Sequence, residues 1–232
     1  MIEIGNLRFS YAEGDFSLEI DELAVANGET VAIVGPSGSG KTTLLNLIAG
    51  TETPRSGQVT TNGHKISGLQ DAARRNFRIS NVGLVLQEFE LLAYLNVLDN
   101  ILLPYRINPT LQLGAGIRKR AEALANSVGI GDKLSRFPDQ LSQGEKQRVA
   151  VVRALVVQPA LLLADEPTGN LDPLNKGRVL DILLQYADDN AATLIAVTHD
   201  HDILDRFQRV IDFNNFHAPG TQRLPDQAEG IA

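Results

Sequence analysis

The most constraining feature of this sequence is a glycine-rich loop near its beginning. The loop reads Gly35-Pro36-Ser37-Gly38-Ser39-Gly40-Lys41-Thr42 and matches the pattern G-x-x-x-x-G-K-[ST]. It follows the β-branched run 30–34, typical of a buried strand, and precedes a helical pattern over 42–49. Glycines let the backbone fold around an anion, so that N–H groups and the helix N-terminus face phosphate oxygens. The motif therefore predicts a nucleoside triphosphate site in an α/β fold.

Two residues of the loop carry specific chemistry. Lys41 is expected to reach the β- and γ-phosphates, and the Thr42 hydroxyl to ligate Mg²⁺. The alternative is a chance glycine-rich turn, but average composition produces this pattern in roughly 1% of chains of this size, before the strand–loop–helix context is required. The functional interpretation is therefore preferred. The expected nucleotide contacts of this segment are Gly35, Pro36, Ser37, Gly38, Ser39, Gly40, Lys41, Thr42 and Thr43.

A second apolar strand pattern, over 160–164, ends in two carboxylates, Asp165 and Glu166. In a phosphate-loop enzyme, a carboxylate at such a strand end holds Mg²⁺, usually through water. The next carboxylate can act as a general base on the attacking water. Alone, two acids ending a strand in solvent would be the better interpretation. Together with the phosphate loop, they predict Asp165 as a metal ligand and Glu166 as the catalytic base.

Elsewhere, strand and helix patterns alternate, which is typical of a mostly parallel sheet. Polar–apolar alternation over 2–25 predicts N-terminal strands, and Asn62-Gly63 predicts a hairpin within 57–66. The segment 71–159 is mainly helical in pattern. Further elements are expected as helices at 117–128, 144–157 and 174–187, a buried strand at 193–198 and an edge strand at 209–213. The Pro-, Gly- and polar-rich tail 218–232 is expected to be disordered.

Composition excludes several classes of function. The 232 residues include no cysteine, which excludes a disulfide scaffold, a thiolate metal site and cysteine catalysis. Lys and Arg number 21 against 28 Asp and Glu, and the resulting charge of −7 argues against general nucleic-acid binding. No apolar run approaches the roughly 20 residues that span a bilayer, and no secretory signal is recognisable. We therefore expect a cytosolic protein that would reach a membrane through a protein partner.

Several further motifs occur in an order typical of one family. They are Tyr11, Gln87, Leu141-Ser142-Gln143-Gly144-Glu145, Asn170-Leu171-Asp172 and His199. With the phosphate loop and the two carboxylates, they make the chain resemble the ATP-binding subunits of ABC transporters over about residues 2–213. The resemblance implies a P-loop NTPase fold in one ATPase domain, 1–217, with a RecA-like core and an N-terminal antiparallel β-subdomain. An α-helical subdomain would be inserted at about 88–159.

The resemblance also implies roles for single residues. Gln87 would sense Mg²⁺ and the γ-phosphate, His199 would stabilise the transferring phosphoryl group, and Asp172 would lie in a loop crossing a dimer interface. Tyr11 would stack on adenine, although a lone Tyr after a strand is more often packing. A metal site in His199-Asp200-His201-Asp202 is a weaker interpretation, since one motif is not a coordination shell. The run Arg118-Lys119-Arg120 is interpreted as a solvated helix face.

Ser142-x-x-Glu145 has a structural interpretation as a capping box that opens the helix 144–157. The functional interpretation uses the same geometry, because Ser142 and the Gly144 amide would present the positive end of a helix dipole to a γ-phosphate. The resemblance implies that this phosphate is bound by a second, head-to-tail copy. The family carries Gly where this chain has Gln143, so we expect reduced or retuned hydrolysis and not its loss.

The resemblance finally implies partners and a class of transport. The segment 88–105 combines apolar residues of exposed character with acids, and a membrane permease is expected to dock there, at the inner face of the cell membrane. Residues 165–172 and 99–104 resemble the ATPases of lipoprotein-releasing and macrolide-type exporters. This favours export or extraction of a lipoprotein, lipid or hydrophobic compound. The alternatives are a cell-division-type complex that transmits a mechanical signal, an importer, and a soluble ATPase of DNA repair or translation, which would need insertions or tandem units.

Overall fold

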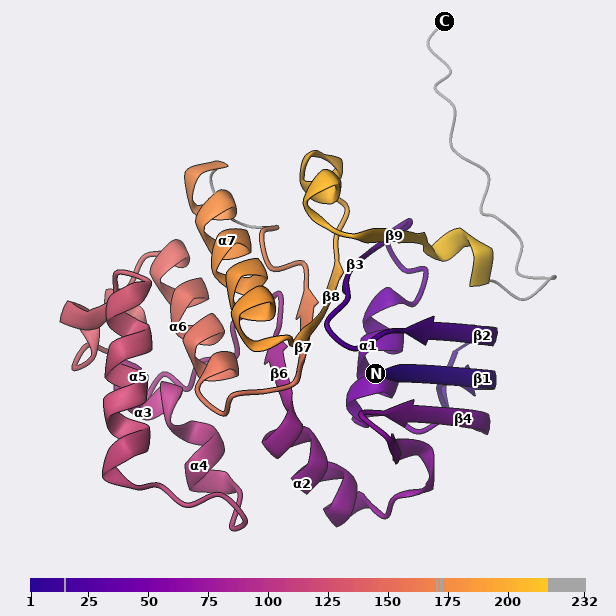
Figure 1. The fold of residues 1–232 in the computed structure, drawn as a ribbon, viewed down its shortest axis with the longest axis horizontal. Helices are drawn as coiled ribbons and strands as arrows, with labels where there is room; N and C mark the ends of the chain where they lie inside the picture. Colours follow the sequence, from indigo (N-terminus) through magenta and orange to yellow (C-terminus); the bar gives the residue numbers. More distant parts are fainter. Residues whose placement is uncertain (15, 170, 172, 217–232) are drawn as a thin grey trace, which may run out of the picture.

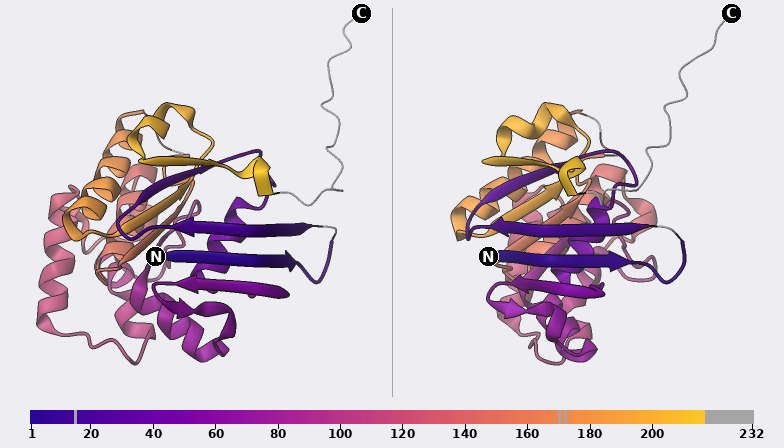
Figure 2. Two further views of the ribbon diagram at one scale, coloured as in Figure 1. Left: turned by 45° about the vertical axis from the view of Figure 1, so that its right-hand side comes forward. Right: turned by 90° about the vertical axis from the view of Figure 1, so that its right-hand side faces the viewer.

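The computed structural model describes residues 1–14, 16–169, 171 and 173–216. Residues 218–232, predicted as a disordered tail, and Asp172, predicted at a dimer interface, lie outside the described residues. In the described part, an antiparallel sheet faces one side of a parallel sheet, with helices between them and on the far side (Figure 1). Figure 2 shows the antiparallel strands as a separate layer. None of the described helices combines the length and apolar character needed to cross a bilayer.

The antiparallel sheet confirms the N-terminal strand predictions. Strand β1 (Ile2–Ser10) pairs with β2 (Ser17–Val25) and with β4 (Ser56–Thr61), and β5 (His64–Lys65) completes the order β2-β1-β4-β5. The buried side of β1 changes from even to odd positions across a β-bulge after Gly5, because one extra residue shifts the alternation. The predicted hairpin is present, with Asn62 and Gly63 at φ of 50° and 74° between β4 and β5.

The parallel sheet has the order β6-β7-β8-β3-β9. Its strands are β3 (Thr30–Val34), β6 (Val82–Val85), β7 (Leu161–Asp165), β8 (Thr193–Val197) and β9 (Arg209–Asp212). All its pairings are parallel, and β9 lies at the edge as predicted. Residues on both faces of β7 are buried: Leu161 and Leu163 join one core with α1 (Lys41–Ala49), and Leu162 joins a second core. This two-sided burial explains the continuous apolar runs.

Strand β6 corrects the prediction of a mainly helical segment over 71–159. It has four residues, too few for a recognisable period, and it lies between α2 (Asp71–Asn81) and Gln87. Its strand conformation comes from pairing with β7, where Val82 faces Leu161 and Val85 faces Ala164. Contacts distant in the sequence thus decide the conformation of this short segment.

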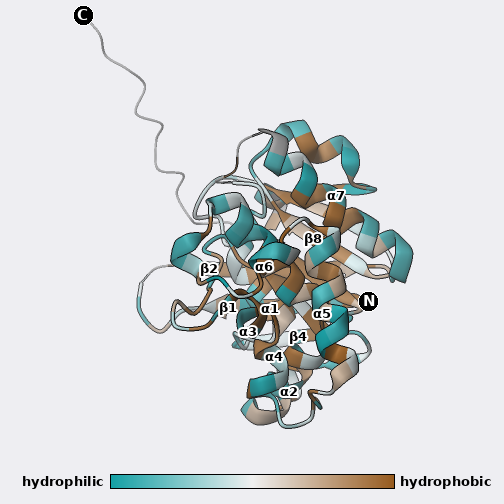
Figure 3. Ribbon diagram, turned by 90° about the vertical axis from the view of Figure 1, so that its left-hand side faces the viewer, coloured by the Kyte–Doolittle hydropathy of each residue, from teal (hydrophilic) through white to brown (hydrophobic). Residues whose placement is uncertain are grey.

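Three helices confirm the predicted ones to within a few residues: α5 (Ala115–Ser127), α6 (Gln143–Leu155) and α7 (Pro173–Asn190). Two shorter helices, α3 (Val97–Ile101) and α4 (Leu103–Ile107), lie in the segment predicted as mainly helical, without predicted bounds of their own. Short 3-10 helices occupy Ile66–Gly68, Gly131–Lys133, Pro138–Gln140, His201–Arg206 and Phe213–Phe216. Helices α3 to α6 share a third core of their own. Figure 3 shows hydrophilic residues on α2 and α5 and hydrophobic residues on the strands behind them.

Two expectations about this helical region are wrong. In the segment 88–105, Val97, Ile101 and Leu102 are at most 1% exposed, because α3 packs them into the third core, whereas Tyr94 is 75% exposed. In the basic run of α5, Arg118 and Lys119 are exposed as predicted, whereas Arg120 is half-buried. Its guanidinium donates to the Tyr105 hydroxyl at 2.7 Å and to the Gln158 side chain. Successive helix residues point about 100° apart, so one residue of the run faces the neighbouring helix.

The two-sided burial of the parallel sheet generates a stability prediction. Leu162 is fully buried, so Leu162→Ala should lower the free energy of unfolding by ~2–5 kcal/mol through lost burial and a residual cavity. Urea denaturation followed by circular dichroism would measure it. Leu113→Ala is the matched control, because Leu113 is 44% exposed and should change stability by about 0.5 kcal/mol or less. Equal losses in both variants would contradict the assigned core.

Candidate nucleotide-binding site

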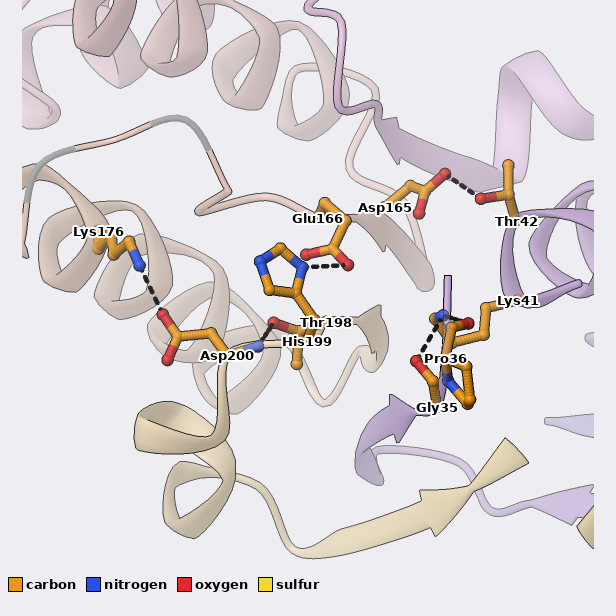
Figure 4. Close-up of polar contacts among 10 residues, drawn as sticks. All are labelled: Gly35, Pro36, Lys41, Thr42, Asp165, Glu166, Lys176, Thr198, His199 and Asp200. Carbon is orange, nitrogen blue, oxygen red and sulfur yellow. Dashed lines mark hydrogen bonds and ion pairs between the residues drawn. The ribbon is translucent and has the colours of Figure 1, made fainter. Parts of the chain in front are cut away.

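The site lies where parallel strands end. The loop 35–40 connects β3 to α1, Asp165 ends β7, and His199 follows β8 by two residues. The carboxyl ends of parallel strands share one edge of a sheet, which is where α/β folds bind ligands. Figure 4 shows side chains from these separate segments pointing toward one another. The structure thus brings together residues that are more than 120 positions apart in the sequence, as in the Thr42–Asp165 pair.

The phosphate loop curls around the ammonium group of Lys41. This side chain is 8% exposed, and its Nζ donates to the carbonyls of Gly35 and Pro36 at 2.8 and 2.7 Å. Gly40 has a φ of 99°, and a Cβ there would lie 2.6 Å from a ring atom of Phe16, so only glycine fits the turn into α1. Burial lowers the pKa of Lys41, while the charges of Glu166 and then Asp165 oppose that shift.

Thr42 and Asp165 place two side-chain oxygen atoms next to each other in the site. The Thr42 hydroxyl donates to Asp165 Oδ2 at 2.8 Å. Asp165 is 7% exposed, and burial raises its pKa, an effect opposed by the hydrogen bond from Thr42 and reinforced by the charge of Glu166. Among the described residues, no group of three or more His, Cys, Asp or Glu could hold a metal ion. A hydroxyl and a carboxylate fit Mg²⁺ as it binds beside phosphates, with few protein ligands.

Glu166 and His199 form a second pair in the same cavity. Their Oε1 and Nδ1 atoms are 2.8 Å apart, and the exposed fractions of the two side chains are 12% and 70%. Glu166 has a φ of 47°, and its N–H donates to the Val197 carbonyl at 3.0 Å. A left-handed conformation is uncommon for a non-glycine residue, and it is found most often at functional sites. The strained turn directs a largely buried carboxylate toward an exposed imidazole.

Aromatic side chains line another part of the cavity. Tyr11 is 39% exposed, and its hydroxyl lies 3.0 Å from the Thr43 hydroxyl. Its ring centroid is 5.7 Å from that of Phe16. Phe16 is a site residue that the sequence analysis missed. Tyr11 and Phe16 lie at the two ends of the connection between β1 and β2, next to the pair Ser10–Ser17. The sequence predicts strands over 2–25 but not their pairing, which brings the two rings together.

These groups line one cavity of about 690 Å³. Its lining residues are Tyr11, Phe16, Gly35, Ser37, Gly38, Gly40, Lys41, Thr42, Thr43, Gln87, Asp165, Glu166, Val197 and His199. Of the predicted phosphate-loop contacts, Pro36 and Ser39 are absent from the lining; the Pro36 carbonyl binds Lys41, and Ser39 is 6% exposed. The cavity has room for a nucleotide.

The signature residues Ser142, Gln143 and Gly144 lie away from this cavity, at the N-terminus of α6. The predicted capping box is present: the Glu145 N–H donates to Ser142 Oγ at 3.3 Å, and the Ser142 N–H donates to Glu145 Oε2 at 2.8 Å. Gln143 is exposed and lines a separate hollow with Gln87. A single copy therefore does not bring the signature residues to its own phosphate loop.

Comparisons with known proteins agree with this geometry. A family model described as ABC transporter matches residues 18–169. The chain belongs to the ABC transporter family. A lipoprotein-releasing system ATP-binding protein, LolD of Xanthomonas euvesicatoria, is 41% identical over 208 residues, covering 88% of this chain and 84% of that protein. The macrolide export ATP-binding/permease protein MacB of Rhodopirellula baltica is 40% identical over 91% of this chain, which spans 31% of MacB.

A solved structure supports the same family assignment. The dimeric, post-hydrolysis structure of the ATP-binding cassette MJ0796 with ADP and Pi has a TM-score of 0.83 and 32% identity, and the match covers 91% of this chain and 94% of that one. Other relatives near 40% identity are named only as uncharacterised ABC transporter ATP-binding proteins. The predicted family, α/β P-loop fold and ATPase activity are confirmed: the chain is an ABC transporter ATPase subunit.

The buried carboxylate of Asp165 generates a pH prediction. Because its folded pKa is raised above the ordinary value of 3.8, the folded chain holds this proton to a higher pH than the unfolded chain. Stability is therefore lost as the pH rises from 3.8 through the raised pKa. Asp165→Asn should remove that loss and stabilise the nucleotide-free ATPase at about pH 7, with each kcal/mol raising Tm by roughly 2–4 °C.

Thermal denaturation across pH would test this effect. The gain should shrink toward about pH 3, where both states of the wild type are protonated. Asp189→Asn, on an exposed position of α7, is the control and should show no gain. An Asp165→Asn variant less stable than the wild type at neutral pH would mean that this charge stabilises the fold.

Proposed function

We propose that this ATPase subunit powers a membrane complex that exports or extracts a lipoprotein, lipid or hydrophobic compound. The observation that carries the chemical part is the convergence of Lys41, the Thr42–Asp165 pair and the Glu166–His199 pair in one cavity. The transport class is supported by the similarity, at about 40% identity, to the lipoprotein-releasing protein LolD and the macrolide export protein MacB. The proposed location is the cytoplasmic face of the membrane, where the subunit would bind the permease.

Each residue of the cavity has a proposed part in hydrolysis. Lys41 and the loop amides bind the phosphates, and the rings of Tyr11 and Phe16 bind the adenine of the nucleotide. Mg²⁺, held by Thr42 and Asp165 with Gln87 nearby, would neutralise charge on the transferring phosphoryl group. Glu166 accepts a proton from the attacking water, and its Oε1 lies 2.8 Å from His199 Nδ1. His199 is exposed enough to contact the γ-phosphate.

The second half of each site is proposed to come from another copy of the chain. The N-terminus of α6 presents the Ser142 hydroxyl and the amides of Gln143 and Gly144 as donors for an anion. Since α6 does not reach its own phosphate loop, a head-to-tail dimer would place this end on the partner's γ-phosphate, with Asp172 at the interface. MJ0796 is dimeric in its solved structure. ATP would then stabilise the closed dimer, and its hydrolysis would reopen it.

The catalytic-base assignment predicts a trapped dimer. Glu166→Gln should slow hydrolysis by 10²-fold or more and leave ATP binding intact, because the amide cannot accept the proton from water. Size-exclusion chromatography with ATP and Mg²⁺ should show a dimer. Lys41→Ala added to Glu166→Gln is the control: loss of phosphate binding should return the monomer, and calorimetry should show weakened ATP affinity. A Glu166→Gln variant that stays monomeric and hydrolyses normally would refute the role of Glu166 as base.

The proposed subdivision and docking surface lie in the helical region. We propose that α3 to α6, with their own core, form the inserted subdomain at about 88–159 within the ATPase domain 1–217. An apolar groove of about 270 Å³ runs between β6 and α4. Its lining includes Glu90, Leu103 and Pro104 from the segment 88–105, together with the 58% exposed Ile107. Here a cytoplasmic helix of the permease would dock.

Arg153 of α6 lines the groove and contacts the segment that follows Gln87. Its guanidinium donates to the carbonyls of Phe89 and Glu90 at 2.6 and 2.5 Å, two and three residues beyond Gln87. Burial lowers the pKa of Arg153, and the charge of Glu90 opposes that shift. Movement at Gln87 would therefore be passed to the groove through the segment 88–90.

The docking proposal predicts a separation of binding from hydrolysis. Leu103→Asp should weaken assembly at least tenfold by placing a charge in the groove, and ATP hydrolysis by the isolated subunit should be unchanged. The measurement is co-purification with the membrane protein encoded by the neighbouring gene. Leu113→Asp is the matched control, since Leu113 is exposed and outside the groove. Undiminished assembly of Leu103→Asp would refute this surface, and a cargo assay on the assembled complex would decide between transport and mechanical signalling.

A further inference from the structure

His199 depends on its backbone for its orientation. Its ring is 70% exposed, and its described polar contact is with Glu166. Because few atoms pack around this imidazole, the backbone of the residues on either side sets the direction of the ring. Thr198, on one side, is fully buried, and its N–H donates to the Ile33 carbonyl at 3.1 Å. The position of Asp200, on the other side, therefore decides how the loop after β8 leaves the sheet.

Asp200 is held through three hydrogen bonds. Its N–H donates to Thr198 Oγ1 at 3.0 Å, and its Oδ1 accepts from the Asp202 N–H at 3.1 Å, capping the 3-10 helix His201–Arg206. Its Oδ2 accepts from Lys176 Nζ at 2.7 Å. This last bond holds the pKa of Asp200 below its usual value. Two of these contacts lie within the loop, whereas Lys176 belongs to α7 and ties the loop to a separate element (Figure 4).

The start of α7 also contacts α6, the helix that begins at the signature residues. Asn175, next to Lys176, accepts a hydrogen bond from Arg148 of α6 at 2.9 Å. Gly144 packs so closely on Asn175 that a Cβ at position 144 would lie 3.0 Å from the Asn175 side chain. The first turn of α7 thus contacts α6 through Asn175 and the His199 loop through Lys176. It links the donors at the N-terminus of α6 to the histidine.

We propose that Lys176 and Asp200 are positioning residues that hold His199 against Glu166. The inference rests on the proposed part of His199 in hydrolysis. Neither residue would touch the nucleotide. The ion pair would fix the start of α7 relative to the loop after β8, so that a shift of α6 or α7 on dimer closure moves the imidazole with it.

A second ion pair between the same elements provides a matched control. Arg206, at the end of the 3-10 helix, donates to Asp181 of α7 at 2.8 Å. These side chains are 43% and 61% exposed, whereas those of Lys176 and Asp200 are 31% and 14% exposed. Exposed pairs contribute little to stability, and this one lies seven residues from His199 in the chain. It ties the two elements together without adjoining the histidine.

The experiment is a steady-state kinetic analysis of the full chain. Lys176→Met and Asp200→Asn should each lower kcat for ATP hydrolysis roughly tenfold, since small misplacements of a catalytic group have effects of this order. The KM for ATP should not change. Asn at 200 can still accept from the Asp202 N–H, so the cap survives. The double variant should be no slower than either single variant, because both remove one interaction. Lys176→Arg should retain most of the activity, and Asp181→Asn should match the wild type.

A spectroscopic readout separates positioning from general stability. The His199 ring signals, assigned by their loss in His199→Ala, should shift in nuclear magnetic resonance spectra of Lys176→Met and not of Asp181→Asn. Wild-type kcat in Lys176→Met, an equal loss of kcat in Asp181→Asn, or unmoved ring signals would each overturn the inference. If His199→Ala hydrolyses ATP like the wild type, the proposed part of His199 fails instead.

Discussion

The register between three parallel strands is the constraint on which the site depends. Strand β8 pairs with β3 so that Val197 faces Ile33, and with β7 so that Val197 also faces Asp165. The last residues of all three strands are therefore level, and their following loops leave the sheet at one edge. A slip of one residue would turn every side chain of a strand to the opposite face. Burial on both faces excludes such a slip, so core packing sets the distances between Lys41, Asp165 and His199.

The electrostatics of the cavity follow from that arrangement. Two carboxylates, Asp165 and Glu166, lie beside one ammonium, Lys41, in a chain of net charge −7. Side-chain charge alone would repel a triphosphate from such a site. The groups of the chain that can attract a triphosphate are the backbone N–H groups of the loop and Lys41, and a carboxylate and a hydroxyl are available to hold a divalent cation beside it. The overall charge of the chain is thus uninformative about this ligand, although it does oppose nonspecific association with polyanions.

Local sequence patterns predicted most of the fold and most of the site, and the exceptions have a common cause. The phosphate loop, the Asn62-Gly63 turn and the capping box at Ser142 are set by residues near one another in the chain. Strand β6, the contacts of Arg120 with Tyr105 and Gln158, and the ring of Phe16 in the cavity depend on partners far along the chain or across a hairpin. The bond from Lys176 to Asp200 spans 24 residues and two elements, and neither residue type signals it alone. Motifs identify the reacting groups, but the contacts that orient those groups come from packing.

The family carries Gly where this chain has Gln143, and the effect of this difference can be judged from the contacts that hold α6. The cap is made by Ser142 and Glu145, and the helix is tied to the turn after β7 by Gln147, whose side chain donates to the Pro167 carbonyl at 2.8 Å. None of these contacts uses the Gln143 side chain, which is exposed. The amides at the N-terminus of α6 therefore keep their geometry, and an added side chain changes what surrounds a bound phosphate. Because Gln147 connects α6 to the turn that follows Asp165, a shift of α6 in one copy would be passed to the turn that carries Glu166 in the same copy. In a head-to-tail dimer, these contacts in each copy would couple the two nucleotide sites.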